Sequence, residues 1–159
     1  MLSNQELEQL LSDLESDRVE RKESIGDKDR IRQAICALAN DLPNYNLPGV
    51  IFVGAKDDGG CAYLPVTDRL LQTLASMRDD GNILPFPTMT VQKKKISGCE
   101  LVVIEVSPSF TPPVRYNGRV WIRVGPRRAQ ATAEEERRLT EKRRSGDLTY
   151  DQRDRRAHV

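Results

Sequence analysis

VRYNGRVWIRV, at residues 114–124, is the stretch of the sequence with the clearest local structure. The pair Asn117-Gly118 at its centre supplies the positive φ angles that a tight two-residue turn needs. The residues on either side alternate in polarity, as they do in a half-buried β-strand. The stretch therefore predicts a β-hairpin and places antiparallel strands in the fold.

Three stretches upstream of this hairpin also have the pattern of β-strands. Val50–Val53 is a short, β-branched apolar run between two glycines, which predicts a strand buried on both faces. Met89–Lys95 and Leu101–Val106 are separated by a Ser-Gly turn, which predicts another antiparallel pair. We expect the hairpin at 114–124 to extend the sheet that these strands form.

Helical patterns alternate with the strands. Ser3 and Glu6 have the spacing of a capping box, and leucines follow at helical intervals, so a helix is expected over about Gln5–Glu15. Asp27 can cap a second helix that ends near Asn40, and a third begins at Thr67. A short extended segment is expected between the first two helices. Helices combined with antiparallel strands predict an α+β fold.

The C-terminal segment predicts a helix of a different kind. Thr132 and Glu135 form a second capping box, and the acidic residues of the segment precede its basic ones, which suits an exposed helix. Leu139 is its only large apolar residue before Gly146, so we expect this helix to bury little and to project. The sequence thus divides into a domain over 1–131 and a charged helix with a flexible tail over 132–159.

Composition narrows the class of protein without naming a partner. The chain has 159 residues, enough for one domain, and its net charge of +1 favours no ligand. Cys36, Cys61 and Cys99 are odd in number and widely spaced, so we expect buried free thiols in a reducing compartment. No apolar run approaches the roughly 20 residues of a membrane span. A soluble, cytoplasmic protein is the expectation.

Four stretches, in order and at matching intervals, resemble the Schlafen-type AlbA domain family. They are ESDRVERKES from Glu15, ICALAN from Ile35, VIFVGAKDDG from Val50 and VWIRVGPRRAQATAEEE from Val120. The resemblance implies a mixed, mostly antiparallel sheet with flanking helices. The sequence departs from the family pattern in the longer loop at 40–49, whose role the sequence does not indicate. It also ends soon after the charged helix, where bacterial relatives often continue into a winged-helix region.

Two functions are implied by this resemblance. Bacterial members are described as DNA-binding transcriptional regulators, and animal Schlafen relatives include endoribonucleases that act on structured RNA such as transfer RNA. The first implies a nucleic-acid-binding module, and the second implies a metal-dependent enzyme. A third hypothesis is a protein-interaction or homo-oligomerisation domain, which would require the charged C-terminal helix to pack against another copy.

The hairpin region carries the residues that favour nucleic-acid binding. Strand alternation puts Arg119, Trp121 and Arg123 on one face, which we expect to point outward while the valine face packs on the core. Guanidinium groups match phosphate geometry and an indole can stack on an unpaired base. The alternative is that these arginines pair with surface acids around a packed Trp121. The candidate binding residues are Arg115, Arg119, Trp121, Arg123, Arg127, Arg128, Lys93 and Lys95, although for the lysines taken alone the protection of a sheet edge is the favoured interpretation.

The resemblance to the ribonuclease branch implies a catalytic set. Glu15, Glu20 and Asp57 occupy the positions of its carboxylates and would hold Mg²⁺ or Mn²⁺, while Lys22 would contact the phosphate. Arg21 stands where the ribonuclease pattern has an aromatic residue, and a cation there could neutralise a carboxylate in place of a metal. The alternative role of Glu20 is a structural salt bridge with Arg21 or Lys22.

Other chemistries find no support in the sequence. GAKDDGG has its lysine misplaced for a phosphate loop and acids where phosphates would lie, so ATP binding is not expected. His158, the only histidine, lies in the C-terminal tail, which argues against a histidine-based catalytic triad or zinc site.

Overall fold

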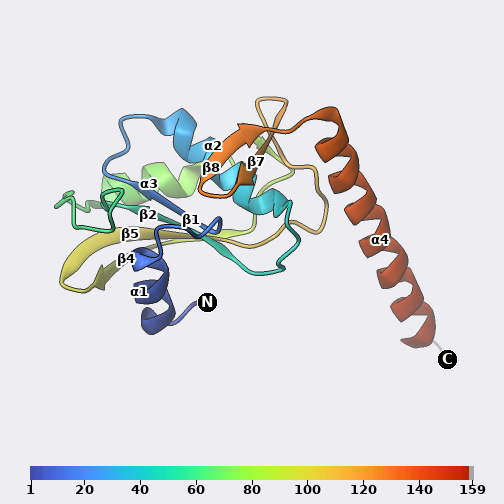
Figure 1. The fold of residues 1–159 in the computed structure, drawn as a ribbon, viewed down its shortest axis with the longest axis horizontal. Coiled ribbons are helices and arrows are strands. Elements are labelled where there is room, and N and C mark those ends of the chain that lie inside the picture. Colours follow the sequence, from blue (N-terminus) through green and yellow to red (C-terminus); the bar gives the residue numbers. More distant parts are fainter. Residues whose placement is uncertain (158–159) are drawn as a thin grey trace.

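The computed structural model describes the backbone of residues 1–157 and the side chains of residues 1–146. The chain forms an α+β fold in which two four-stranded sheets lie on opposite sides of one helix, α2 (Lys28–Asn40) (Figure 1). The first sheet contains, in spatial order, β1 (Val19–Lys22), β2 (Gly49–Val53), β5 (Cys99–Val106) and β4 (Met89–Ile96). The second contains β3 (Ile83–Leu84), β6 (Arg115–Tyr116), β7 (Arg119–Val124) and β8 (Arg127–Gln130). The expected fold class, with mixed and mostly antiparallel pairing, is confirmed.

β2 lies at the centre of the first sheet. It pairs in parallel with β1 and antiparallel with β5, and all of its residues are buried. Because alternate side chains point to opposite faces of a strand, Phe52 packs in the cluster that contains α1 (Asn4–Ser12), whereas Ile51 packs with α2 and α3 (Asp68–Ser76). The prediction of a strand buried on both faces is confirmed.

The sequence had predicted that the hairpin extends this first sheet. That prediction is wrong, because β6 and β7 belong to the second sheet. Asn117 and Gly118 adopt φ angles of 48° and 80°, so the predicted turn between β6 and β7 is confirmed. The segment between β5 and β6 contains three prolines, which lack the N–H needed to continue a strand ladder. The chain therefore leaves the first sheet before the hairpin begins.

α2 joins the two sheets because both of its sides are buried. Its C-terminal residue Asn40 donates from Nδ2 to the carbonyl oxygens of Trp121 at 2.8 Å and Val114 at 3.0 Å. Its Oδ1 accepts the Val114 N–H at 2.6 Å. A buried amide with its hydrogen bonds satisfied in this way fixes the second sheet against the helix.

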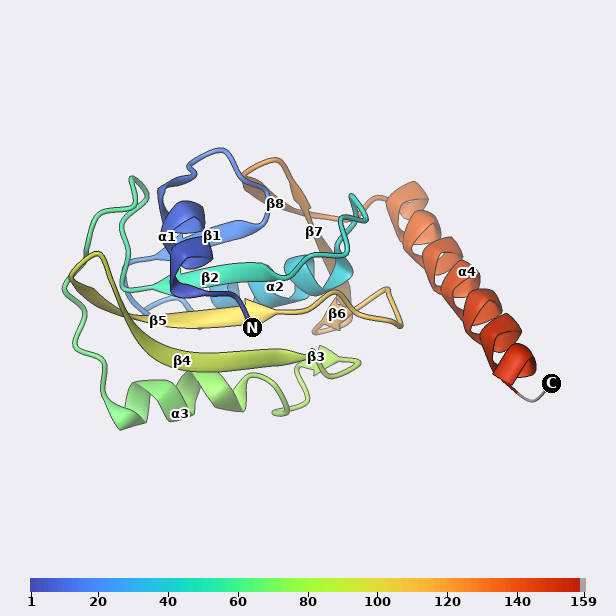
Figure 2. The ribbon, with the colours of Figure 1, turned by 90° about the horizontal axis from the view of Figure 1, so that it is seen from below.

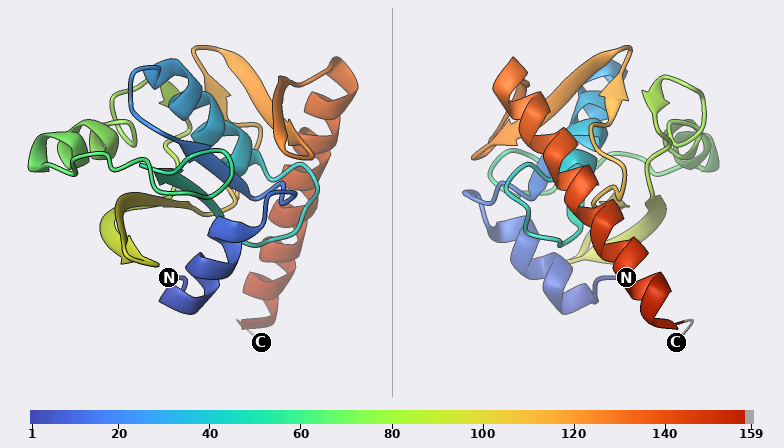
Figure 3. Two further views of the ribbon diagram at one scale, coloured as in Figure 1. Left: turned by 60° about the vertical axis from the view of Figure 1, so that its left-hand side comes forward. Right: turned by 90° about the vertical axis from the view of Figure 1, so that its right-hand side faces the viewer.

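The C-terminal helix α4 (Ala133–Ala157) is anchored more firmly than its composition predicted. Leu139 is buried against the hairpin, and Lys142 donates to the carbonyl oxygens of Asn40 and Asp41 at 3.2 and 2.9 Å. Beyond these contacts the helix extends away from the domain, as Figure 2 shows. In both views of Figure 3 it runs past one side of the domain to the level of α1. The side chains of the tail expected after Gly146 lie outside the described residues. No helix in the described part of the chain could span a membrane.

The cysteines differ from expectation. Cys61 and Cys99 form a disulfide, so the prediction of three free thiols is wrong. The two residues are 38 positions apart, but an antiparallel bridge between Ala55 and Cys61 returns the loop after β2 to the sheet beside β5. Cys36 is the buried free thiol that the sequence predicted, and burial raises its pKa to about 12.

Candidate functional site

The middle of β7, where the sequence predicted a basic surface, is covered on both faces from Val120 to Arg123. Trp121 packs against the main core with its indole N–H buried, and Arg123 is only 4% exposed. On the opposite face, Val120 and Ile122 pack against Leu139 of α4. Arg119, Trp121 and Arg123 share a face of β7, as strand alternation predicted. The prediction that this face points outward was wrong for Trp121 and Arg123, because the face packs against α2 and β1 while α4 covers the other face.

Glu20 on β1 is the carboxylate around which the polar side chains of this region gather. Its Oε1 lies 2.5 Å from Nη1 of Arg123 and 3.1 Å from Nε of Arg128. Its Oε2 lies 3.5 Å from Nζ of Lys22, which strand alternation places on the same face of β1. We call these four residues the Glu20 cluster. Three positive charges meet one negative charge there, so the cluster has an excess of two positive charges.

The Glu20 cluster ties the first sheet to the second sheet and to α2. Arg123 also donates from Nη2 to the carbonyl oxygen of Val19 at 2.8 Å, which fixes β7 to β1. Arg128 donates to the carbonyl oxygen of Arg30 on α2 at 3.1 Å. Burial lowers the pKa of Arg123 and the neighbouring Glu20 charge raises it, but an arginine remains charged under either influence.

The other two carboxylates of the implied metal set do not join Glu20. Glu15 is exposed in the turn after α1, where its backbone N–H bonds to Asp13 Oδ1 at 3.2 Å. Asp57 is exposed in the loop after β2. No group of three potential metal-binding side chains forms within the described residues. The residues implied for Mg²⁺ or Mn²⁺ therefore do not fit such an ion in this arrangement.

Arg21, the departure from the ribonuclease pattern, has a structural role. Its guanidinium donates to the carbonyl oxygens of Leu11, at 2.6 Å from Nη2, and of Asp13, at 2.9 Å, where α1 ends. Burial lowers the pKa of Arg21, and the Asp13 charge opposes that effect. A cation at this position satisfies carbonyl groups that the helix leaves unpaired. Of the two neighbours that the sequence offered Glu20 as salt-bridge partners, Lys22 forms the pair and Arg21 does not.

The remaining arginines of the hairpin are at the surface. Arg119 and Arg127 are exposed, and neither has an ion-pair partner among the described side chains. Arg115 is also exposed, but its Nη1 lies 3.1 Å from Oε1 of Glu136 in the first turn of α4. Arg119 and Arg127 are therefore the hairpin cations most available to an anionic ligand.

The lysines on β4 do not extend this surface. β4 is the edge strand at the opposite side of the first sheet from β1. Lys93 pairs with Glu100 on β5 at 2.6 Å, and Lys95 is exposed. This placement agrees with the alternative prediction that the lysines protect a sheet edge.

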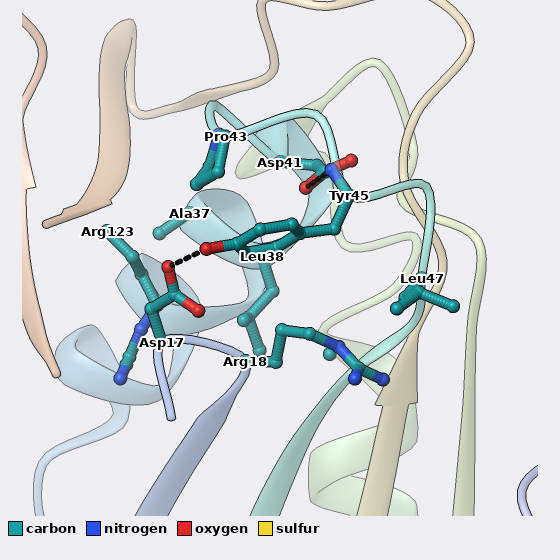
Figure 4. Close-up of a pocket in the computed structure, with 10 residues that line it drawn as sticks. Asp17, Arg18, Ala37, Leu38, Asp41, Pro43, Tyr45, Leu47 and Arg123 are labelled. Carbon is teal, nitrogen blue, oxygen red and sulfur yellow. Dashed lines mark hydrogen bonds between the residues drawn. The ribbon is translucent and has the colours of Figure 1, made fainter. Parts of the chain in front are cut away.

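The long loop at 40–49, which the sequence left unexplained, lines a small pocket beside β7 (Figure 4). Asp41 anchors the loop by accepting the N–H groups of Tyr45 at 3.1 Å and Asn46 at 2.9 Å. The Tyr45 hydroxyl donates to Asp17 at 3.0 Å, and this hydrogen bond to a carboxylate raises the pKa of Tyr45. Arg18 adds two hydrogen bonds to the Pro48 carbonyl oxygen. The contacts of Tyr45 with Asp17 and of Arg18 with Pro48 join residues 28 and 30 positions apart, so no local pattern could have indicated them.

Comparisons with known proteins agree with this fold. The family model described as Schlafen, AlbA_2 matches residues 15–132. A crystal structure of the DIP2311 protein from Corynebacterium diphtheriae is 19% identical with a TM-score of 0.51, over 79% of this chain and 29% of that one. A solution structure of the N-terminal domain of a RecG-related protein from Nitrosomonas europaea is 24% identical with a TM-score of 0.48, over 68% of this chain and 74% of that one. A comparison with curated proteins finds no match. The match to the Corynebacterium protein covers less than a third of the length of that protein.

Proposed function

The chain belongs to the Schlafen, AlbA_2 family, and we propose that it is a nucleic-acid-binding domain that holds its ligand without cleaving it. The observation that carries this proposal is the Glu20 cluster. Its carboxylate is engaged by Lys22, Arg123 and Arg128, and the cluster keeps an excess of positive charge. A carboxylate neutralised by three cations is a poor ligand for a divalent metal, and the excess charge suits a phosphate backbone.

The surface around the Glu20 cluster supports the same function. The side chains of Lys22 and Arg128 are each 17% exposed, so both reach solvent while they contact Glu20. Arg127 stands next to Arg128 on β8, and Arg119 lies at the other end of β7. Strand pairing places Arg119 and Arg127 at opposite ends and on opposite faces of this hairpin, so each can contact a separate phosphate. Phosphate contacts position a nucleic acid without reading its sequence. Duplex DNA in a regulatory setting is the first ligand to test, and structured RNA is the second.

Binding should be tested together with cleavage. Labelled duplex DNA and labelled transfer RNA are incubated with the protein in EDTA or in Mn²⁺, and both retention and strand scission are scored. We expect binding in EDTA that weakens as salt rises, because phosphate contacts release counterions. Arg119→Gln combined with Arg127→Gln should lower the salt slope by about 2, or about 1 for each lost phosphate contact.

The control variant for this experiment is Lys95→Gln. It removes one positive charge from an exposed residue on β4, at the edge of the first sheet away from β1, and it should leave the salt slope unchanged. Cleavage that requires Mn²⁺ and disappears in Glu20→Ala would replace the proposal with the endoribonuclease function. Absence of binding at low salt to either nucleic acid would contradict both functions.

A further inference from the structure

Two aromatic side chains are exposed on the segments that connect β3 to β4 and β5 to β6. In Figure 2 these two connections lie at the end of the domain from which α4 departs. Phe110 is 93% exposed and Phe86 is 54% exposed. Leu84, at 52%, adds an aliphatic side chain to the same group. Large apolar side chains are usually buried, so a group of them on adjacent segments indicates a contact surface. We call Leu84, Phe86 and Phe110 the aromatic platform.

Backbone pairing holds the two segments of the platform side by side. The Ser107 N–H donates to the Thr88 carbonyl oxygen at 2.9 Å, where both segments leave the β4–β5 ladder. At their other ends, Leu84 pairs with Arg115 in the β3–β6 ladder. Phe86 and Phe110 lie between these two pairings on opposite segments. The platform therefore spans two loops that are joined at both ends.

The loops that carry the platform are also fixed to the domain. Pro87 and Pro112 are buried, and the Ser109 N–H donates to the carbonyl oxygen of Ala39 on α2 at 2.8 Å. The Thr111 N–H donates to Ser109 Oγ at 3.1 Å. The backbone of such anchored loops loses little conformational entropy when a ligand binds, which favours recognition by a preformed surface.

Positive charge lies beside the platform. Arg115 is the strand partner of Leu84, so the two side chains lie on the same face of the second sheet, whereas Arg119 pairs with Tyr116 on the opposite face. Arg115 forms a half-exposed ion pair with Glu136, and a phosphate group can compete for such a surface pair. Exposed rings next to a guanidinium match a ligand that combines flat apolar groups with negative charge.

We propose that the aromatic platform stacks the unpaired bases of single-stranded nucleic acid while Arg115 contacts the phosphate backbone. This inference rests on the proposed function and narrows its ligand to strands with unpaired bases. Bases in an intact duplex are stacked on one another, so the platform favours a single strand or an unpaired loop.

The test compares one strand in two states. The full chain is titrated into a fluorescein-labelled oligothymidylate of about 16 nucleotides, and into the same strand annealed to its complement, with anisotropy as the readout. Phe86→Ala combined with Phe110→Ala should weaken binding to the single strand about tenfold or more, from lost stacking, and duplex binding by less than about twofold. Circular dichroism and thermal unfolding check that the variant keeps its fold.

Tyr63→Ala is the matched control. Tyr63 is 84% exposed in the loop after β2, away from the platform, so its removal should leave both affinities unchanged. If the wild-type protein binds both ligands and the double variant binds each ligand with the wild-type affinity, the platform inference fails while the proposed function stands. If the wild-type protein binds neither ligand at low salt, both fail. A wild-type dimer that the double variant converts to a monomer would make the platform an interface between copies and overturn the inference.

Discussion

Arg119 and Arg123 lie on the same strand and the same face, yet their surroundings differ completely. Arg119 is exposed and has no ion-pair partner among the described residues. Arg123 is buried between the two sheets, where it bonds to Glu20 and to the Val19 carbonyl oxygen. The same residue type thus builds the fold at one position and is available to a ligand at the other, and only contacts from distant elements distinguish the two.

The largest effect that this comparison predicts is on stability. Arg123→Ala leaves the Val19 carbonyl oxygen without this donor and Glu20 without its shortest contact, so the free energy of unfolding should fall by about 3 kcal/mol. Arg119→Ala, an exposed change, should alter it by less than about 0.5 kcal/mol. Urea denaturation of both variants measures the difference. Equal costs would show that Arg123 does not hold the sheets together.

The opposite face of β7 gives the next largest effect. Leu139→Ala should lower the free energy of unfolding by about 2 kcal/mol, because among the described residues of α4 it removes the one buried side chain, which packs on Val120 and Ile122. Arg143→Ala, an exposed change on the same helix, serves as the control. If thermal unfolding showed no difference between these variants, α4 would not cover the hairpin in solution.

Arg127 and Arg128 repeat the comparison on adjacent residues. Arg128→Gln should lower the free energy of unfolding by about 1 kcal/mol, because it removes a partly exposed pair with Glu20 and a bond to α2. Arg127→Gln should leave stability unchanged and instead lower the salt slope of nucleic-acid binding by about 1. Urea denaturation and binding anisotropy measured on both variants separate the structural residue from the ligand-binding one. If Arg127→Gln lowered stability and Arg128→Gln lowered only the salt slope, Arg127 would be the structural residue and Arg128 the ligand-binding one.

The smallest effect is spectroscopic. Trp121 is the only tryptophan, and its indole packs against the main core with its N–H buried. Its fluorescence should therefore be blue-shifted, poorly quenched by acrylamide, and little changed when an oligonucleotide is added. Strong quenching by the nucleic acid would show that the Trp121 indole is exposed, as strand alternation alone suggested.

Several elements were predictable because their causes are local. The turn at Asn117-Gly118 depends on backbone angles that few residues adopt, and the capping boxes at Ser3 and Thr132 depend on residues three positions apart. The burial of β2 follows from its run of β-branched residues. Such patterns established the fold class and most of the helices and strands.

The candidate site was predictable only in part. Alternation showed that Arg119, Trp121 and Arg123 share a face, but alternation has no information about which face meets the core. That choice depends on Glu20 from β1 and Leu139 from α4, which approach the hairpin from opposite sides. The disulfide between Cys61 and Cys99 was missed for the same reason, because the loop after β2 returns to the sheet beside β5.

The sequence by itself therefore determined the local conformations, the α+β class and the family. Tertiary structure decided which charges are neutralised and which remain available. A lone carboxylate such as Glu20 is a potential metal ligand in the sequence, and it becomes the centre of an ion-pair network once Arg123 and Arg128 are brought to it. The physical reason is that the energy of a charge depends on the charges within a few ångströms of it, and these come mainly from distant parts of the chain.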